Sequence, residues 1–218
     1  QRGVDAAWNG DTVIVYPGTY AGNVDYGDKS IVLASRILES GDTTYVDSTI
    51  IEGIVTIGNA ADSTALFSGF TITGDFTSRG LSVASNHNVL IEHIKVLGVG
   101  GVSFSSAVAT MHDVVIKNNE HSSQGGGMYI FNSTIDLVNV VIDSNVTSSN
   151  EGGGIYFYSG EVTMDSAQIT NNASENEGGG IYLVDNTTTL TISNSSITGN
   201  STEGGGGGIY NSSGTLDL

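Results

Sequence analysis

Two histidines and two carboxylates occur at matching places in neighbouring stretches of the sequence. Glu92 and His93 lie in the segment VLIEHIKV, and His112 and Asp113 lie in ATMHDVVI, 20 residues further along. If the two stretches run side by side, about 4.8 Å apart as paired strands do, these four side chains converge and Lys95 projects nearby. Imidazole and carboxylate groups together bind Zn²⁺ or a similar ion, or act as general acid and base. The alternative is a solvated outward bend, which accepts any polar residue.

Three glutamates stand just before runs of glycine, and they suggest a second site. Glu151, Glu177 and Glu203 recur at nearly constant spacing. If they align from one repeat to the next, the like charges repel unless a cation lies between them. Calcium takes carboxylate and carbonyl oxygens and is the expected cation, and hence the one cofactor that the sequence suggests. The alternative is that these loop glutamates point separately into water.

A tyrosine ends each glycine run. The runs are GGGMY at 125–129, GGGIY at 152–156 and 178–182, and GGGGGIY at 204–210. The apolar residue before each tyrosine is a core candidate, so alternation along a strand turns the tyrosine outward. Phenol side chains suit sugar rings and hydroxyls, which predicts a carbohydrate-binding surface. The alternative is stacking that stabilises the sheet itself. The tyrosines are Tyr129, Tyr156, Tyr182 and Tyr210.

Repeated strands must position these residues. The pattern apolar-x-apolar-x-x-apolar-x-apolar recurs, for example as Val89/Ile91/Ile94/Val96 and Ile135/Leu137/Val140/Ile142. Period-2 apolar pairs indicate strands with one buried face, and repeats of 20–28 residues that carry three short strands indicate the coils of a parallel β-helix. The LxxLxLxxN pattern of leucine-rich repeats is missing. We therefore expect an all-β, right-handed parallel β-helix.

Asparagines and glycines mark the turns of this solenoid. Asn119, Asn145, Asn172 and Asn200 each follow a core isoleucine by three residues. Stacked asparagines hydrogen-bond from coil to coil and tolerate a left-handed backbone, so we expect a structural ladder. The glycine runs are expected where backbones pass closely or take positive φ.

The organisation expected is one domain over residues 1–218. Residues 4–11 are expected to end a short capping helix, followed by a strand over 12–16. Residues 1–20 then form the cap and first strand, 21–64 irregular early coils, and 65–218 regular coils. The sequence stops at TLDL, so we expect a coil truncated midway and an open C-terminal end.

Composition narrows the classes of partner. Six basic and 23 acidic residues give a net charge of −17, which repels nucleic acid and anionic membranes. No apolar run approaches the roughly 18–20 residues that a membrane span needs, so direct membrane insertion is not expected. The chain has no cysteine, which excludes disulfides and thiolate metal sites.

The segment GDTVIVYPGTY at 10–20 resembles the opening of pectin-lyase-like right-handed β-helix proteins. The GGGI and IxxN pairs resemble the GGxI and FxxN repeats of polymorphic outer-membrane protein adhesins, with Ile in place of Phe. Polygalacturonase-like enzymes carry Asn-Thr-Asp, Asp-Asp, Gly-His-Gly and Arg-Ile-Lys motifs. Only His93-Ile94-Lys95 comes near the last of these. Arg2, Arg36 and Arg79 do not match the base of a pectate lyase, because none is expected on a strand face with clustered acids.

The function expected is that of a non-catalytic, secreted or cell-surface protein. It would act as an adhesin or structural stalk that binds an extracellular carbohydrate or protein along its outer faces. The first alternative is a polysaccharide lyase or glycoside hydrolase of the pectin-lyase-like class. The second is an end-to-end stacking subunit of an extracellular fibre, because unpaired terminal strands recruit further chains.

Overall fold

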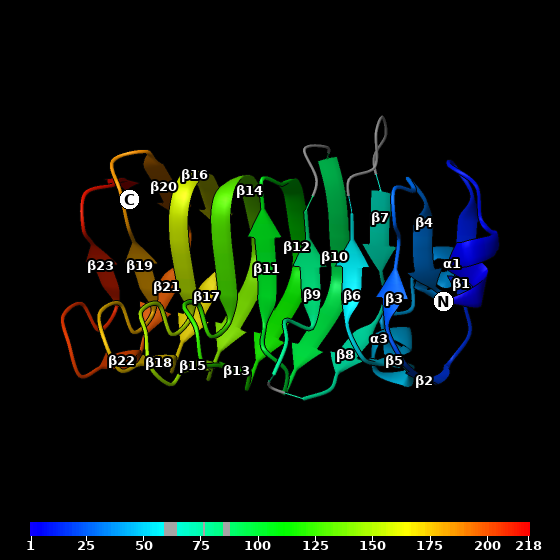
Figure 1. Ribbon diagram of the computed structural model, residues 1–218, viewed down its shortest axis with the longest axis horizontal. Coiled ribbons are helices and arrows are strands. Elements are labelled where there is room, and N and C mark those ends of the chain that lie inside the picture. The colour runs from blue at the N-terminus through cyan, green and yellow to red at the C-terminus, as the bar shows by residue number, and fades with distance from the viewer. Residues whose placement is uncertain (59–64, 76, 85–87) are drawn as a thin grey trace.

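The computed structural model describes residues 1–58, 65–75, 77–84 and 88–218, and it has the expected architecture. The chain winds into an elongated cylinder, with helix α1 (Arg2–Ala6) at one end and strand β23 (Ile209–Asn211) at the other (Figure 1). The strand pairs are parallel, and each joins one coil to the next. The protein is therefore an all-β, right-handed parallel β-helix with a short N-terminal helix.

Three strand faces form the wall of the cylinder. The first face contains β1 (Thr12–Val15), β4 (Val32–Ser35), β7 (Ala65–Ser68), β20 (Thr188–Ser193) and β24 (Thr215–Asp217). The second contains β2 (Gly18–Ala21), β5 (Thr49–Glu52), β8 (Thr71–Thr73), β17 (Gln168–Thr170) and β21 (Ser196–Thr198). The third contains β3 (Val24–Asp25), β6 (Val55–Ile57), β9 (Leu81–Val83), β11 (Val102–Ser105), β19 (Ile181–Leu183) and β23.

Four long strands turn the corners between these faces. They are β10 (Asn88–Leu97), β12 (Val108–Lys117), β14 (Met128–Asp143) and β16 (Ile155–Asp165). A separate small sheet lies beside the glycine turns. Its members are β13 (Glu120–His121), β15 (Val146–Thr147), β18 (Ala173–Ser174) and β22 (Ser201–Thr202).

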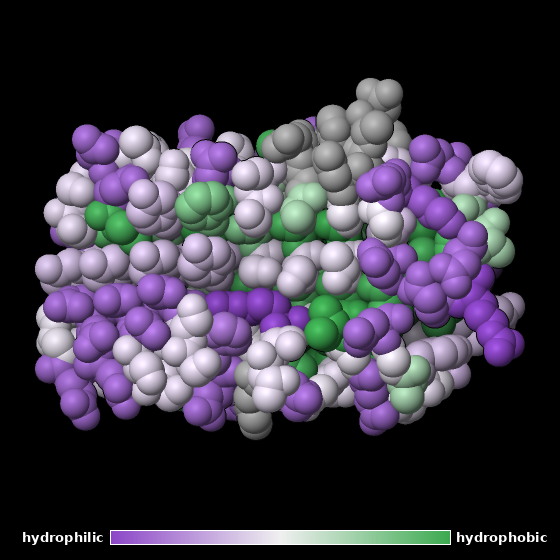
Figure 2. Space-filling model, in the orientation of Figure 1, coloured by the Kyte–Doolittle hydropathy of each residue, from purple (hydrophilic) through white to green (hydrophobic). Residues whose placement is uncertain are grey.

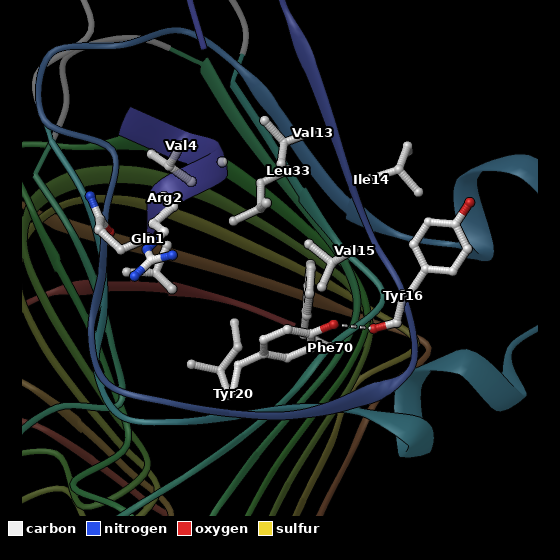
Figure 3. Close-up of a pocket in the computed structure, with 13 residues that line it drawn as sticks. Gln1, Arg2, Val4, Val13, Ile14, Val15, Tyr16, Tyr20, Leu33 and Phe70 are labelled. Atoms are coloured by element: carbon white, nitrogen blue, oxygen red, sulfur yellow. Dashed lines mark hydrogen bonds between the residues drawn. The ribbon is translucent and has the colours of Figure 1, made fainter. Parts of the chain in front are cut away.

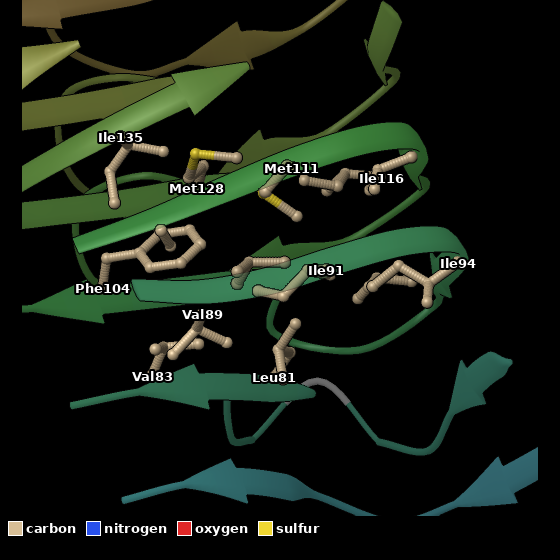
Figure 4. Packing of buried hydrophobic residues seen from close by; sticks show 14 of the residues in the cluster. Leu81, Val83, Val89, Ile91, Ile94, Phe104, Met111, Ile116, Met128 and Ile135 are labelled. Atoms are coloured by element: carbon tan, nitrogen blue, oxygen red, sulfur yellow. The ribbon is translucent and has the colours of Figure 1, made fainter. Parts of the chain in front are cut away.

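The core is one continuous set of stacked apolar side chains. From Phe67 onward, partners on the first face lie 20 to 28 residues apart, as the spacing predicts. Ile91 and Met111 are fully buried on neighbouring coils, and Figure 4 shows them side by side in the interior. A single coil is open above and below, so its inward side chains are buried only when neighbouring coils stack on it.

The bend between the first and second faces requires a left-handed residue in each coil. His93 and Asp113, with φ of 52° and 56°, occupy this position in β10 and β12. Asparagine, aspartate, histidine and glycine adopt this backbone at the lowest cost. The residues of this bend are Gly69, His93, Asp113, Asn139, Ser166 and Asn194. The identities of His93 and Asp113 therefore have a structural reason that is independent of any catalysis.

The first coils differ from the expected arrangement. Helix α1 ends at Ala6, so the prediction of a helix through residue 11 was wrong; Val4 is the helix residue buried against the core. Two further helices were not expected, α2 (Ile37–Ser40) and α3 (Thr44–Ser48). α3 packs on the second face, where the Thr71 hydroxyl donates a 2.8 Å hydrogen bond to the carbonyl of Val46. Within the described part of the chain, no helix has the length and hydrophobicity to cross a membrane.

Four asparagines, here called the asparagine column, form a hydrogen-bonded stack inside the cylinder. They are Asn119, Asn145, Asn172 and Asn200. The amides of the first three each donate to the oxygen of the next asparagine at 2.9 to 3.0 Å. All four amides also donate to a carbonyl of the preceding coil, as Asn145 does to Ile116 at 3.0 Å. The left-handed residue is the one before the column, for example Asn118 or Asn171, so the expectation placed it one residue too late.

The glycine runs make room for the asparagine column. Gly152 has φ of 70° and turns the chain. A Cβ on Gly154 would lie 2.5 Å from the carbonyl oxygen of Gly180 and 3.0 Å from the Asn172 amide. A Cβ on Gly153 would lie 2.3 Å from the carbonyl oxygen of Ala173 in the small sheet. The glycine runs and the asparagine column therefore depend on each other, because the missing Cβ atoms leave the space that the asparagine amides occupy.

Candidate functional site

Four outward tyrosines of the third face form the tyrosine column, Tyr129, Tyr156, Tyr182 and Tyr210. Their ring centroids lie 5.6, 5.5 and 5.2 Å apart in order along the axis, and neighbouring rings are within 4° of parallel. Each ring is partly exposed. The register of β14, β16, β19 and β23 sets this arrangement, because the tyrosines are direct partners from strand to strand.

This stacking changes what the tyrosines offer to a ligand. Ring faces that contact one another leave ring edges and hydroxyls to face solvent. Within the described residues, no group hydrogen-bonds to the hydroxyls of the tyrosine column. The surface therefore presents a row of phenol hydroxyls at the spacing of the coils, and not the open ring faces expected for stacking against sugars.

Arg79 closes the column at its N-terminal end. Its guanidinium carbon lies 5.8 Å from the centroid of the Tyr129 ring. Its nitrogens donate to the carbonyls of Gly100 at 2.8 Å and Gln124 at 2.6 Å, and to that of Gly125. Burial lowers the pKa of Arg79 to about 10. These carbonyls face away from the following coils, so Arg79 satisfies the end of the glycine stack and also covers the first tyrosine ring.

A second aromatic pair lies beside the tyrosine column and was not expected from the sequence. Phe131 and Tyr158 stack with centroids 5.5 Å apart, and they are 37% and 36% exposed. Each follows a column tyrosine by two residues, in MYIF and IYFY, so it points outward from the same strand face. That two-residue offset is the sequence signal that would have found them. Six aromatic side chains therefore share the third face.

Acidic side chains flank the column on its other side, but only two of the three glutamates align. Glu151 and Glu177 occupy equivalent positions, because the amide of Gly125 donates to the carbonyl of Glu151 and that of Gly152 donates to the carbonyl of Glu177. In the next coil the equivalent residue is Gly205, whose carbonyl accepts from Gly178. The prediction that Glu203 continues the column was wrong, because the extra glycines displace it.

Burial and the charges of Glu151 and Glu177 raise the pKa values of two column tyrosines. Burial, and next the charge of Glu151, raises the pKa of Tyr156 to about 12. Burial, then Glu151 and Glu177, also raises the pKa of Tyr182. Both phenols are therefore neutral at ordinary pH and can donate a hydrogen bond. The described residues contain no group of three or more histidine, aspartate or glutamate side chains placed to hold a metal ion.

The histidine and aspartate set lies on a different surface, at the bend between the first and second faces. Asp113 Oδ2 is 3.0 Å from His112 Nδ1 and 3.4 Å from His93 Nδ1, and the second Asp113 oxygen accepts from Asn139. Lys95 forms an ion pair with Asp47 of α3. A groove of about 310 Å³ lies between α3 and these residues.

Of the five predicted residues of this set, the structure brings only part together. His93, His112 and Asp113 share one contact network, and Lys95 lines the groove but is held by Asp47. Glu92 points elsewhere and accepts a 3.3 Å hydrogen bond from the hydroxyl of Ser68. The expectation that Glu92 converges with His93, His112 and Asp113 was therefore wrong.

A neighbouring carboxylate on the second face, that of Asp143, has its charge compensated by three donors. Lys117 Nζ lies 2.7 Å from Asp143, which also accepts from the Thr170 hydroxyl at 2.8 Å and the Asn171 amide at 2.9 Å. Burial opposes ionisation of Asp143, but these three donors outweigh it and hold its pKa at about 2. Asp143 therefore has its partners within the chain.

An apolar pocket of about 480 Å³ opens at the N-terminal end of the cylinder, between α1 and β1 (Figure 3). Val13, Val15 and Phe70 form part of its wall. The hydroxyl of Tyr20 donates to the carbonyl of Tyr16 at 2.8 Å, and the Gln1 amide donates to Asp5 at 2.7 Å. These two polar groups are used within the chain, while Arg2 also lines the pocket and brings a charge to a wall that is otherwise mainly apolar.

Comparison with known proteins agrees with the fold. A family model for a right-handed beta helix region matches residues 52–218. No curated protein and no solved structure matches the chain. The match covers most of the chain, and it carries information about architecture, not about any ligand.

Proposed function

The chain belongs to the right-handed β-helix family, and we propose that it is a non-catalytic, secreted or cell-surface protein. In this proposal it serves as an adhesin or structural stalk, and the third face binds an extracellular carbohydrate or protein. The observation that carries the proposal is the tyrosine column with its flanking pair Phe131 and Tyr158, six aromatic side chains on one outward face.

Two properties of this face support binding. Aromatic side chains are enriched where proteins meet their ligands, because they supply contact area at low entropic cost. The hydroxyls of the column lack partners among the described residues, so a ligand can hydrogen-bond to them without displacing an internal bond. A rigid β-helix holds these groups at constant spacing, which pre-organises them for an extended ligand.

An array of immobilised glycans and extracellular proteins tests this proposal. The wild-type protein is compared with the double variant Tyr156→Ser/Tyr182→Ser and with the double variant Tyr156→Phe/Tyr182→Phe, which keeps the rings. Thr191→Ala, on the outward side of the first face, is the matched control. We expect a ligand whose binding is lost in the Ser variant, reduced in the Phe variant and unchanged in the control. A Ser variant that folds and keeps every interaction of the wild type would refute the proposal.

A second candidate function rests on Asp113, whose carboxylate contacts two imidazoles beside the groove under α3. A carboxylate that holds the Nδ1 side of a histidine leaves Nε2 free to act as a base. In this candidate function the histidine acts as the base of a polysaccharide lyase or hydrolase. New reducing ends or unsaturated products from acidic polysaccharides, abolished by Asp113→Asn, would establish it. Absence of turnover on such a panel would exclude it.

A further inference from the structure

The two outward surfaces differ in how their acids are compensated. On the second face and its bend, Asp47, Asp113 and Asp143 each contact a lysine or a histidine. Beside the tyrosine column, Glu151 and Glu177 have no ion pair within the described residues. The chain carries a net charge of −17, and these two carboxylates place uncompensated charge next to the exposed aromatic side chains.

The groups of the third face are ordered in parallel rows along the cylinder. The coil of Tyr156 carries all three groups: Glu151 comes first, Tyr156 follows the glycine turn, and Tyr158 comes two residues later. The coil before it adds Phe131 to the aromatic side, and the coil after it adds Glu177 to the acidic side. Figure 2 shows rows of similar side chains parallel to the long axis on one side of the molecule. The tyrosine column therefore runs between an acidic row, Glu151 and Glu177, and an apolar row, Phe131 and Tyr158.

The chemistry of these rows selects the charge of the ligand. The column phenols are neutral at ordinary pH, and their oxygens accept hydrogen bonds from cations. The two carboxylates accept charge-assisted hydrogen bonds from lysine and arginine. An anionic ligand on the column would be repelled by both carboxylates, and a neutral ligand would leave their charge uncompensated, whereas a cationic ligand would neutralise it.

We infer that the third face binds an extended, basic segment of another protein, in which lysine or arginine alternates with apolar residues. Side chains of an extended chain point alternately to opposite sides. A segment that lies along the tyrosine column therefore directs its basic side chains to Glu151 and Glu177 and its apolar side chains to Phe131 and Tyr158. The inference rests on the proposed function, because it names the partner for the same face.

Fluorescence anisotropy with a labelled synthetic peptide of alternating lysine and leucine tests the inference. The comparison ligands are the same peptide with glutamate in place of lysine, a soluble chitosan oligomer and a neutral β-linked glucose oligomer. The key variant is Glu151→Gln/Glu177→Gln, which keeps side-chain shape and removes charge. The matched control is Glu161→Gln, an exposed glutamate on the first face.

We expect binding of the lysine peptide that weakens about five-fold in the double Gln variant, in line with two exposed ion pairs. The affinity should fall with added salt, and Glu161→Gln should leave it unchanged. Tighter binding of the glutamate peptide or of either oligosaccharide would overturn the inference. So would equal weakening by Glu161→Gln, because it would show attraction to the overall negative charge and not to this face.

The double variant Tyr156→Ser/Tyr182→Ser separates this inference from the proposed function. One outcome is that a ligand no longer binds to the Ser variant but binds fully to Glu151→Gln/Glu177→Gln. That outcome refutes the basic partner but supports the third face as a binding surface. Full binding of the lysine peptide by the folded Ser variant refutes the basic segment as the ligand of this face, and the proposed function is refuted only if that variant also keeps every interaction found on the array.

Discussion

The asparagine column and the tyrosine column are built by the same device, one residue type repeated in register, yet they have different consequences. Asn145 and Asn172 are fully buried, and their amides bond to the neighbouring coils on both sides. Tyr156 and Tyr182 contact each other through their rings but leave their hydroxyls to solvent. In the asparagine column every polar group serves the fold, while in the tyrosine column the polar groups remain available.

The difference teaches where function is to be sought in a repeated fold. Where every polar group of a repeated column is hydrogen-bonded inside the fold, a substitution leaves buried groups without partners and lowers stability. Where an outward column has polar groups without a partner in the chain, those groups are available to bind a ligand. Repetition alone does not distinguish them, so substitutions in the two columns should separate stability from recognition.

The largest effect is expected for Asn145→Ala. The Asn145 side chain donates to Ile116 and Asn172 and accepts from the backbone and side-chain amides of Asn119. Its removal leaves several buried groups unsatisfied, which should lower the free energy of unfolding by about 3–5 kcal/mol. Urea denaturation followed by circular dichroism measures this. Asn176→Ala, in an exposed loop, should change it by less than about 0.5 kcal/mol. Equal losses in the two variants would contradict the role of the column.

A smaller loss is expected for Gly154→Ala, which tests the space that the asparagine column needs. The added Cβ would lie 2.5 Å from the Gly180 carbonyl oxygen and 3.0 Å from the Asn172 amide, so the coils must shift at a cost of about 1–3 kcal/mol. Gly208 holds the same position in a later coil, where a Cβ would approach nothing closer than 3.7 Å. Gly208→Ala should therefore be tolerated, and thermal denaturation of the two variants gives the comparison.

The glycines and asparagines also show why the architecture could be predicted from the sequence. Inner residues recur because every coil packs on its neighbours in the same way. The regular spacing of Ile, Asn and Gly is therefore visible in the sequence alone. The helices α2 and α3 lie outside that regularity, in the stretch between β4 and β5. Nothing repeats there, and the segment is held by contacts to the second face, such as Thr71 to Val46.

Outward residues were harder to place than inward ones. Counting residues put Glu203 beside Glu177, but the longer glycine run places Gly205 there, because a turn absorbs extra residues without disturbing the core. The orientation of the tyrosine rings was equally hidden, since sequence alternation shows which side a residue faces but not what its ring contacts. The pairing of Asp113 with two histidines depends on rotamers that no pattern encodes.

The tyrosine column should contribute less to stability than the asparagine column. Tyr182 stacks on two neighbours, and each aromatic pair contributes about 0.5–1.5 kcal/mol, so Tyr182→Ser should cost about 1–3 kcal/mol. Serine is a natural choice because Ser82 and Ser103 occupy the same outward row in earlier coils. Tyr210 stacks on one neighbour in the column, and Tyr210→Ser should cost about half as much. Equal losses by thermal denaturation would mean that the stacking contributes little.

The smallest effect concerns ionisation. Burial and then Glu151 raise the pKa of Tyr156 to about 12 in the folded protein, against about 10 in an unfolded chain. The neutral phenol is therefore the form that folding favours. Its contribution to stability is present below pH 10 or so and is lost as the pH rises towards about 12. The difference in ultraviolet absorbance at alkaline pH between wild type and Tyr156→Phe reports this titration.

Glu151→Gln should lower the pKa of Tyr156 but keep it above that of an exposed tyrosine, because burial is the larger cause. A Tyr156 that titrates like an exposed tyrosine in the folded wild type would show that neither burial nor the acidic row acts on the column, and would remove the electrostatic ground for a basic partner.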